Sequence, residues 1–391
     1  MVYSRPSSVF LRSLANMLFN IRFILLLSLP VFISACVSLP PAPSDTNTEV
    51  VVETSVEHNQ VKDVSNAGNG AGPKIKQQQT SSKESASQKN AKDTLASSDK
   101  SAANEQPLRL QTARFAHASA SDGKLLYVFA GYGKQGYLSD VEIINPQTGQ
   151  SSVLANKVLA RGYFSAVFDQ QHSIYLLGGI GPQPEDVRVE QRIEVFDTRT
   201  HETRVIGNIP EPLKDNKAVY LNGYIYVLGG ASYHAANGYQ LIPSDALWRF
   251  DVKQQKWQKM ANLPSAKSTE VVAHNNTIYA VGGEQNSENL AAVERYDVTS
   301  NTWHTMAALP HPVSAHSVAW LNNALWVFAD EDQHNNSYVL HDNATKWQAT
   351  SFDYQSALYT SVNTIGNSLY VIGGNAGKGN SFMRLIQVFT P

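Results

Sequence analysis

The chain has 391 residues, of which 42% are hydrophobic and 16% are charged, so part of it can bury a sizeable core. The formal net charge is −2, which argues against a broad nucleic-acid-binding surface, because neutralising phosphates requires clustered positive charge. The single cysteine, Cys36, excludes a disulfide scaffold and a cysteine zinc cluster. We therefore expect no nucleic-acid partner and no cysteine-based cofactor.

Residues 1–35 are predicted to be a secretory signal peptide. The apolar run FILLLSLPVFISA at 23–35 is too short to span a bilayer comfortably as a mature helix, but it fits the hydrophobic part of a signal. It ends in Ile33-Ser34-Ala35-Cys36, which resembles the bacterial lipobox. The resemblance implies a diacylglycerol on Cys36. The alternative is an ordinary signal peptide with a chance cysteine, and translation from Met1 or from Met17 stays open.

The residue after the cysteine bears on localisation. Val37 is not the Asp that retains lipoproteins in the inner membrane of enteric-type bacteria. The resemblance to that system implies a lipid-anchored protein of the outer membrane that faces the periplasm, although exposure on the cell surface stays open.

Residues 36–107 are predicted to be the lipidated cysteine followed by a disordered linker. No aromatic residue lies between Cys36 and Phe115, and the stretch is rich in Ser, Thr, Asn, Gln, Lys and Ala. Such a composition cannot bury enough apolar area to offset the entropy of ordering the backbone. The linker is either a spacer that holds the domain away from the membrane or a connection of no selected length.

The remaining residues, 108–391, consist of six sequence repeats. An apolar run that ends in a small doublet recurs every 44–53 residues, as YVFAG, YLLGG, YVLGG, YAVGG, WVFAD and YVIGG. Turn-forming residues such as Asn222-Gly223 precede each run, and a third apolar strand follows it. Most repeats add a fourth strand. Each unit is therefore predicted to be a four-stranded antiparallel meander, whose strands we call a to d.

Small sheets repeated at this period can hide their edges by stacking radially into a propeller. The Gly-Gly doublets, followed by the pairs Phe250/Trp257 and Tyr296/Trp303, resemble the kelch repeat. The resemblance implies an all-β, six-bladed kelch-type β-propeller, although repeat one has Ala130 for the first glycine and repeat five has Ala329-Asp330. The last repeat lacks a fourth strand, so we expect Leu108–Leu110 to complete it and close the ring.

Loops d–a and b–c of such a meander share one face, and their lengths vary most, so this d–a/b–c face is the expected binding face. Aligning the starts of the first strands gives one ring of residues: Arg114, Arg161, Lys214, Lys267, Ser314 and Ser356. Its four cations are candidate ligand-binding residues around a mouth that attracts anions. Solvated turn cations are the alternative interpretation.

Residues outside this ring are further candidates for catalysis and for ligand binding. Three positions further along lies Glu270, which is a candidate general base, although an ion pair with Lys267 is the interpretation that the residues favour. In the long b–c loop of the third repeat, Tyr233 and His234 are candidate ligand-binding residues that could stack on a sugar. The alternative is that they fold the loop onto itself. The histidines show no metal-ligand spacing, so we expect no metal and no cofactor.

Two functions from different classes remain. The first is a membrane-tethered periplasmic module that binds a protein or an anionic glycan on the d–a/b–c face. The second is a sugar-processing enzyme, because the repeat distantly resembles the bacterial kelch N-acetylneuraminate epimerases (mutarotases), which implies an acidic sugar as substrate. The residues themselves leave open whether the protein is an enzyme.

Overall fold

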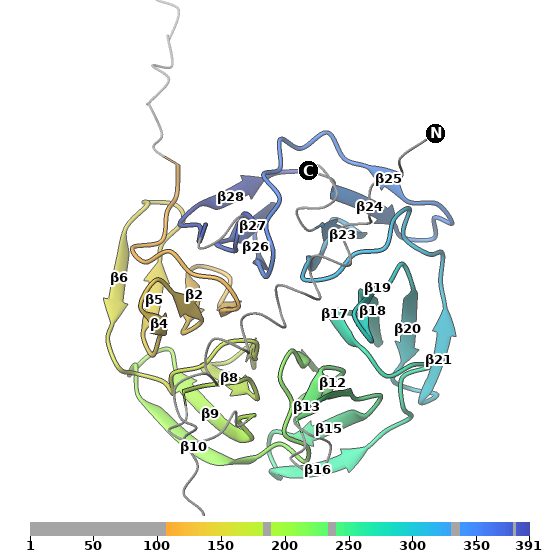
Figure 1. Ribbon diagram of the computed structural model, residues 1–391, viewed down its shortest axis with the longest axis horizontal. Helices are drawn as coiled ribbons and strands as arrows, with labels where there is room; N and C mark the ends of the chain where they lie inside the picture. The colour runs from red at the N-terminus through yellow and green to blue at the C-terminus, as the bar shows by residue number, and fades with distance from the viewer. Residues whose placement is uncertain (1–106, 183–188, 234–239, 330–336, 378–380) are drawn as a thin grey trace, which may run out of the picture. The chain divides into compact units, whose positions relative to one another are not determined.

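The computed structural model describes residues 107–182, 189–233, 240–329, 337–377 and 381–391. These residues form an all-β domain in which six sheets are arranged around a central axis (Figure 1). The signal peptide, the linker and Cys36 lie outside the described residues.

Each sheet is one blade, and its first strand lies nearest the axis. The first three blades, from the inside outward, are β1 (Ala118–Ser121), β2 (Leu126–Phe129), β5 (Val141–Ile144) and β6 (Ser151–Leu154); β7 (Ser165–Phe168), β8 (Ser173–Leu177), β9 (Arg192–Asp197) and β10 (Thr203–Asn208); and β11 (Lys217–Leu221), β12 (Tyr224–Leu228), β15 (Leu247–Asp251) and β16 (Lys256–Lys259).

The other blades follow the same order. They are β17 (Ser268–His274), β18 (Thr277–Gln285), β20 (Val293–Asp297) and β21 (Thr302–Thr305); β22 (Ser317–Leu321), β23 (Ala324–Phe328), β24 (Ser337–His341) and β25 (Gln348–Ala349); and β26 (Ser361–Ile365), β27 (Ser368–Ile372) and β28 (Ile386–Phe389). Short strands decorate the b–c loops: β3 (Tyr132–Gly133), β4 (Gly136–Tyr137), β13 (Ala231–Tyr233), β14 (Leu241–Pro243) and β19 (Glu288–Asn289).

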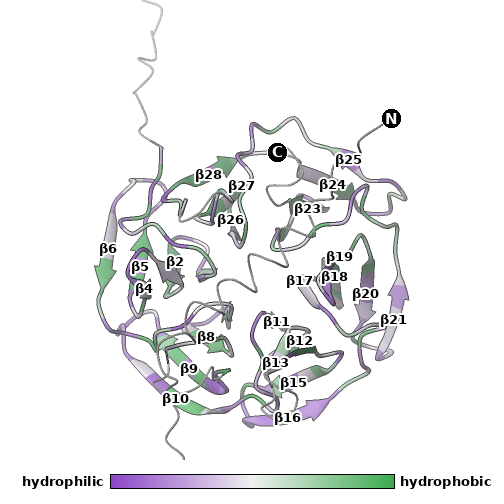
Figure 2. Ribbon diagram, in the orientation of Figure 1, coloured by the Kyte–Doolittle hydropathy of each residue, from purple (hydrophilic) through white to green (hydrophobic). Residues whose placement is uncertain are grey.

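The predicted four-stranded meander is confirmed in the first five blades, and the last blade has three strands of its own. The turns explain how tight the meanders are. Asn222 and Asn275 have φ angles of 53° and 51° in the a–b turns, a left-handed conformation that asparagine tolerates. Polarity follows the position of each strand in the blade. The outer strands β16 and β21 are hydrophilic and largely exposed (Figure 2), whereas the second strands β8 and β23 are apolar and fully buried.

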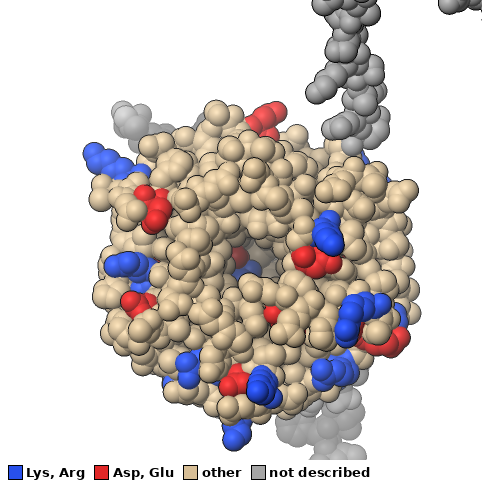
Figure 3. All heavy atoms as spheres, turned by 180° about the vertical axis from the view of Figure 1, so that it is seen from behind, with Lys and Arg blue, Asp and Glu red and all other residues tan. Residues whose placement is uncertain are grey.

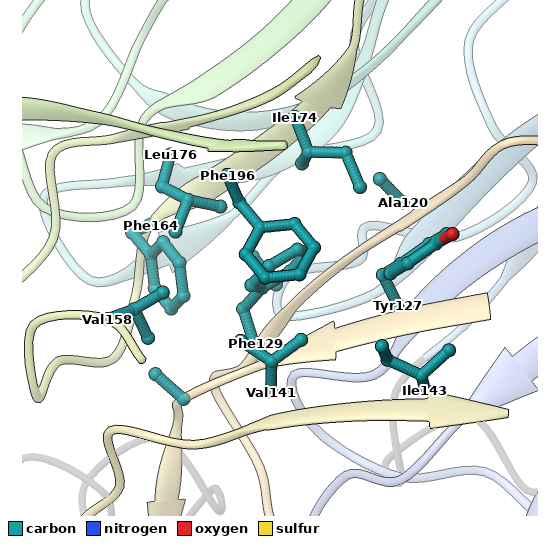
Figure 4. Close-up of a cluster of buried hydrophobic side chains, with 12 residues drawn as sticks. Ala120, Tyr127, Phe129, Val141, Ile143, Val158, Phe164, Ile174, Leu176 and Phe196 are labelled. Carbon is teal, nitrogen blue, oxygen red and sulfur yellow. The ribbon is translucent and has the colours of Figure 1, made fainter. Parts of the chain in front are cut away.

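The hydrophobic core lies between neighbouring blades. Figure 4 shows Phe196 of the second blade against Tyr127 and Phe129 of the first, and the Phe129 and Phe196 ring centroids are 5.5 Å apart. Fully burying one such ring contributes roughly 1.5–3 kcal/mol, so each blade is held chiefly by its neighbours.

The aromatic pairs predicted from the repeat also lie at blade junctions. Trp257 is in register with Phe250, with ring centroids 4.8 Å apart, and its indole N–H donates to the carbonyl of Asn208 in the preceding blade. Trp303 and Trp347 donate in the same way to Ala261 and Ala307. The fourth strand of one blade is thereby tied to the end of the blade before it.

The ring is closed by the residues expected to close it. Arg109 forms an antiparallel bridge with Leu385, and Leu110 N–H donates to the carbonyl of Arg384 at 2.7 Å. Leu110 is fully buried among side chains of the first and last blades. The N-terminal segment therefore takes the outer place beside β28, where the last repeat has no strand of its own.

The glycine doublets mark a close backbone approach. Gly131 has a φ of 94°, and a Cβ there would lie 2.7 Å from the Cβ of His117. A side chain at this position would clash with the start of the first strand, which explains the glycine at position 131.

Candidate functional site

Three of the four predicted ring cations lie inside the blades and do not line an open mouth. Arg114, Arg161 and Lys267 are 0–1% exposed. Arg114 donates to Asp140 at 2.8 and 2.9 Å and to the carbonyl of Ala130 at 2.9 Å. These cations are held by protein acceptors, so the expected ring of ligand-binding cations is corrected.

The other two buried cations are bound in the same manner. Arg161 is paired with Glu194 and donates to the carbonyl of Gly178 at 2.9 Å. Lys267 Nζ lies 2.6 Å from Glu294 Oε2. Each of these cations thus connects the segment before its first strand to the third strand of the same blade.

The backbone explains why the predicted ring was misaligned. In the five doublets whose second residue is described, that residue donates its N–H to the next blade, and the acceptors are the carbonyls of Arg161, Leu213, Lys267, Val313 and Arg114. Leu213 therefore occupies the equivalent position in the third blade, and Lys214 is one residue beyond it. The Lys214 ammonium instead lies over the ring of Tyr163, 5.0 Å from its centroid.

The sequence analysis did not identify the acidic partners of the buried cations, although the third-strand sequences contain a pattern that indicates them. The strand register places Glu142, Glu194 and Glu294 at one equivalent position, opposite the second residue of the second-strand motif. In the remaining blades this position holds Trp248, Tyr338 and Gln387. The acid is present only in the blades that have the buried cation. Comparing VEII, IEVF and VERY with LWRF, SYVL and IQVF would have revealed the pairing.

A cavity of about 420 Å³ runs along the axis. It is lined by the first strands of all six blades, which contact one another around the ring. Figure 3 shows one face of the molecule hollowed at its centre, with acidic and basic side chains in the hollow and others around the rim. The cavity is therefore a product of ring closure.

The charged groups that line this cavity are Lys217 and Glu270. Lys217 Nζ lies 2.6 Å from Glu270 Oε1, and the two side chains are 25% and 16% exposed. The predicted partner of Glu270 was Lys267, and this prediction is wrong because Lys267 is turned inward to Glu294. The actual ion pair joins the first strands of the third and fourth blades.

Burial and the ion pair shift the pKa values of both Lys217 and Glu270. Burial raises the pKa of Glu270, and the nearby Lys217 opposes this effect. Burial alone would lower the pKa of Lys217, but the carboxylates of Glu270 and Asp215 raise it above its usual value. Lys217 is therefore a cation, and Glu270 is a carboxylate whose charge depends on that neighbour.

Uncharged polar groups line the same end of the cavity. His117 Nε2 lies 2.8 Å from Ser361 Oγ, and Ser317 Oγ lies 2.9 Å from Thr360 Oγ1. Burial lowers the pKa of His117 to about 3, with Arg114 and Lys217 adding to the effect. This histidine is neutral at neutral pH, so the net charge contributed by the lining comes from one ion pair and is close to zero.

A second feature is an aromatic cluster on the d–a/b–c face, which we call the aromatic platform. It consists of six partly exposed residues from loops of the sixth, first and second blades: Phe115, Tyr132, Tyr137, Tyr163, Tyr359 and Phe382. Phe115 stacks on Phe382 with centroids 4.9 Å apart, and Tyr163 meets Tyr359 edge-on at 4.9 Å. Three blades thereby present one continuous patch, which the sequence alignment did not reveal.

The remaining predictions concern loops, metals and membranes. The side chain of Tyr233 and all of His234 lie outside the described residues. Within the described ranges, no group of three metal-ligating side chains comes together. The same part of the chain contains no helix that is long and apolar enough to span a membrane.

Comparisons with known proteins agree with this architecture. The attractin/LZTR1 β-propeller family matches residues 89–283, and the Kelch motif matches residues 266–310. Kelch-like protein 40 of Xenopus laevis is 25% identical over 147 residues, which cover 37% of this chain and 23% of that protein. Beta-scruin of Limulus polyphemus is 27% identical over 121 residues, which cover 30% of this chain and 13% of that protein.

The chain thus matches less than a quarter of the length of either relative. The solved structure of YjhT shares 18% identity and a TM-score of 0.61, covering 72% of this chain and 99% of that one. At this level of identity the likeness is one of fold.

Proposed function

Because the chain carries a kelch-repeat β-propeller, we propose that it is an interaction module that binds a protein partner on its d–a/b–c face. The observation that carries the proposal is the aromatic platform. Tyrosine and phenylalanine are enriched at the centres of protein interfaces, where they bury a large area at a small entropic cost. Here six such residues lie together on the loops of three blades.

The charges around the platform suit a partner with acidic groups at its margin. Lys214 lies against Tyr163, at the edge of the cluster, and is partly exposed. The buried cations of the blades are already paired, so they add little to binding. The affinity would therefore come mainly from the rings, and added salt would weaken it only modestly.

The proposal includes a tether. A lipid on Cys36 and the linker up to residue 107 would hold the propeller at the outer membrane, facing the periplasm. Restricting the module to a surface raises its effective concentration towards partners on the same surface. The lipobox-like sequence before Cys36 is what supports this part of the proposal.

The test is site-specific photo-crosslinking in cells. A benzoylphenylalanine at Phe382 would replace a ring of the platform, and the same residue at Lys124, which is exposed in an a–b turn, is the matched control. We expect a discrete crosslinked protein from position 382 and none from position 124. The change Phe115→Ala, made with the crosslinker at 382, should reduce its yield.

Equal crosslinking from both positions, or none from position 382, would contradict the proposal. A crosslinked species that glycosidases remove, with no protein partner, would instead make the ligand a glycan. Turnover of an acidic sugar by the purified domain would favour the alternative of a sugar-processing enzyme.

A further inference from the structure

The Lys217–Glu270 pair in the central cavity has unused hydrogen-bonding capacity. An ammonium has three N–H donors, and the contact uses one of them with Oε1 of Glu270. Among the described residues, Lys217 Nζ has no partner other than Glu270 Oε1, and Glu270 Oε2 has no hydrogen-bond partner. Hydroxyl groups of the lining have partners, as Ser165 has the carbonyl of Asn216 at 2.9 Å and Ser317 has Thr360.

The pair constrains which ligands the cavity can accept. A ligand with one charge would compete for one member of the pair and leave the other member unpaired at a poorly solvated position. Leaving one charge of a buried pair uncompensated is costly, so such ligands bind weakly. A ligand that carries both charges at short range can bind the cation and the anion together, and every charge keeps a partner.

The rest of the cavity permits such a ligand. Its volume of about 420 Å³ lies within the range of small-molecule sites. Val271 and Val362, which are partly exposed, provide apolar surface in the lining, which would accommodate a side chain. His117, from the first blade, lines the cavity opposite the fourth blade; it is 6% exposed, and its Nδ1 has no partner within the described residues.

We propose that the central cavity binds a small zwitterion of the α-amino acid class. The ligand carboxylate would accept hydrogen bonds from Lys217, and the ligand ammonium would donate to Glu270. This site is separate from the aromatic platform, because none of the six platform residues lines the cavity. A variant that abolishes binding in the cavity should therefore leave partner binding at the aromatic platform intact, and the reverse should also hold.

The test is a ligand panel on the purified propeller, measured by thermal shift and then by calorimetry. Each standard amino acid is compared with its amide, which is a cation, and with its N-acetyl derivative, which is an anion. We expect at least one amino acid, at about 10 mM, to raise the melting temperature. Its two singly charged derivatives should bind at least about tenfold more weakly.

The variant K217M/E270L removes both charges together and so leaves no unpaired charge in the cavity. It should remain folded and lose at least about tenfold in affinity for the amino acid. The matched control is K157M/E202Q, which removes a Lys–Glu pair with a 3.6 Å separation that does not line the cavity, and this variant should bind as the parent does. Three results would overturn the proposal: no amino acid binds, the singly charged derivatives bind equally well, or K217M/E270L binds unchanged.

Discussion

At the residue scale, the buried cation and the carboxylate that faces it occur together: a blade has both or neither. Blades with a cation at the equivalent position have a glutamate opposite it, whereas the third blade has Leu213 and Trp248 in these two positions. A buried ion pair can be exchanged for an apolar pair, but one partner alone leaves a buried charge. The chain therefore displays both solutions, the ion pair in the first, second and fourth blades and the apolar pair in the third.

The first prediction tests this coupling. Arg161→Met should lower the free energy of unfolding by about 3–5 kcal/mol, because Glu194 would be buried without its partner. Arg161→Met/Glu194→Leu should recover most of that loss. Urea denaturation followed by circular dichroism measures both values. If the double variant is less stable than Arg161→Met, the pair does not act as a unit.

The second prediction concerns pH. Burial lowers the pKa of His316 to about 3, with Lys217 and Lys267 adding to the effect, against an ordinary value of 6.5. Between these values the unfolded chain binds a proton that the folded chain does not. The free energy of unfolding therefore falls as pH falls below 6.5, by about 1.4 kcal/mol per pH unit for this histidine.

His316→Asn should weaken that dependence. Between about pH 7 and about pH 5, the variant should lose about 2 kcal/mol less stability than the parent. Urea denaturation at the two pH values measures the difference, and His304→Asn is the control because His304 is exposed. Identical pH dependence in parent and His316→Asn would show that His316 titrates normally.

At the scale of elements, each blade depends on strands from its neighbours. The third and fourth strands carry the aromatic and tryptophan residues that join blade to blade. The last blade has only β26, β27 and β28, so its outer edge would expose unpaired backbone groups without Leu108–Leu110. A segment far away in the sequence completes it.

The third prediction removes that segment. A chain that starts at Gln111 should melt several degrees below one that starts at residue 104, because it lacks the buried Leu110 and the hydrogen bonds to Arg384 and Ile386. Burial of one leucine is worth roughly 1.5–3 kcal/mol. Calorimetry gives both melting temperatures, and equal values would refute closure by this segment.

At the scale of the whole molecule, ring closure separates two surfaces. The loops of one face assemble the aromatic platform, whereas the first strands enclose the cavity with its Lys217–Glu270 pair. Residues more than forty positions apart in the sequence meet at both places. A partner and a small ligand can therefore occupy different parts of the same propeller.

The fourth prediction concerns the tether. Metabolic labelling with a palmitate analogue should mark the parent protein and miss Cys36→Ser, because the lipid requires the thiol. Fractionation should move the variant out of the membrane. Equal labelling of the two proteins would contradict lipidation at Cys36.

The sequence by itself determined the number of blades, the order of their strands and the closing segment, because each follows from a local pattern that recurs. Apolar runs, turn residues and glycine doublets report the backbone at their own positions. The ring cations failed as a prediction because Arg114, Arg161 and Lys267 are buried against acidic residues of their own blades. At Lys214 the alignment by counting from the doublets was also one residue off, and in a strand a shift of one residue reverses the face.

Only the tertiary structure decided which charges are buried and which face the axis. Lys267 and Glu270 are three residues apart, yet one is paired inside its blade and the other pairs with Lys217 of the neighbouring blade. The platform likewise depends on loops of three blades meeting in space. Such contacts are set by the closed ring, since the position of each strand depends on the blades on both sides.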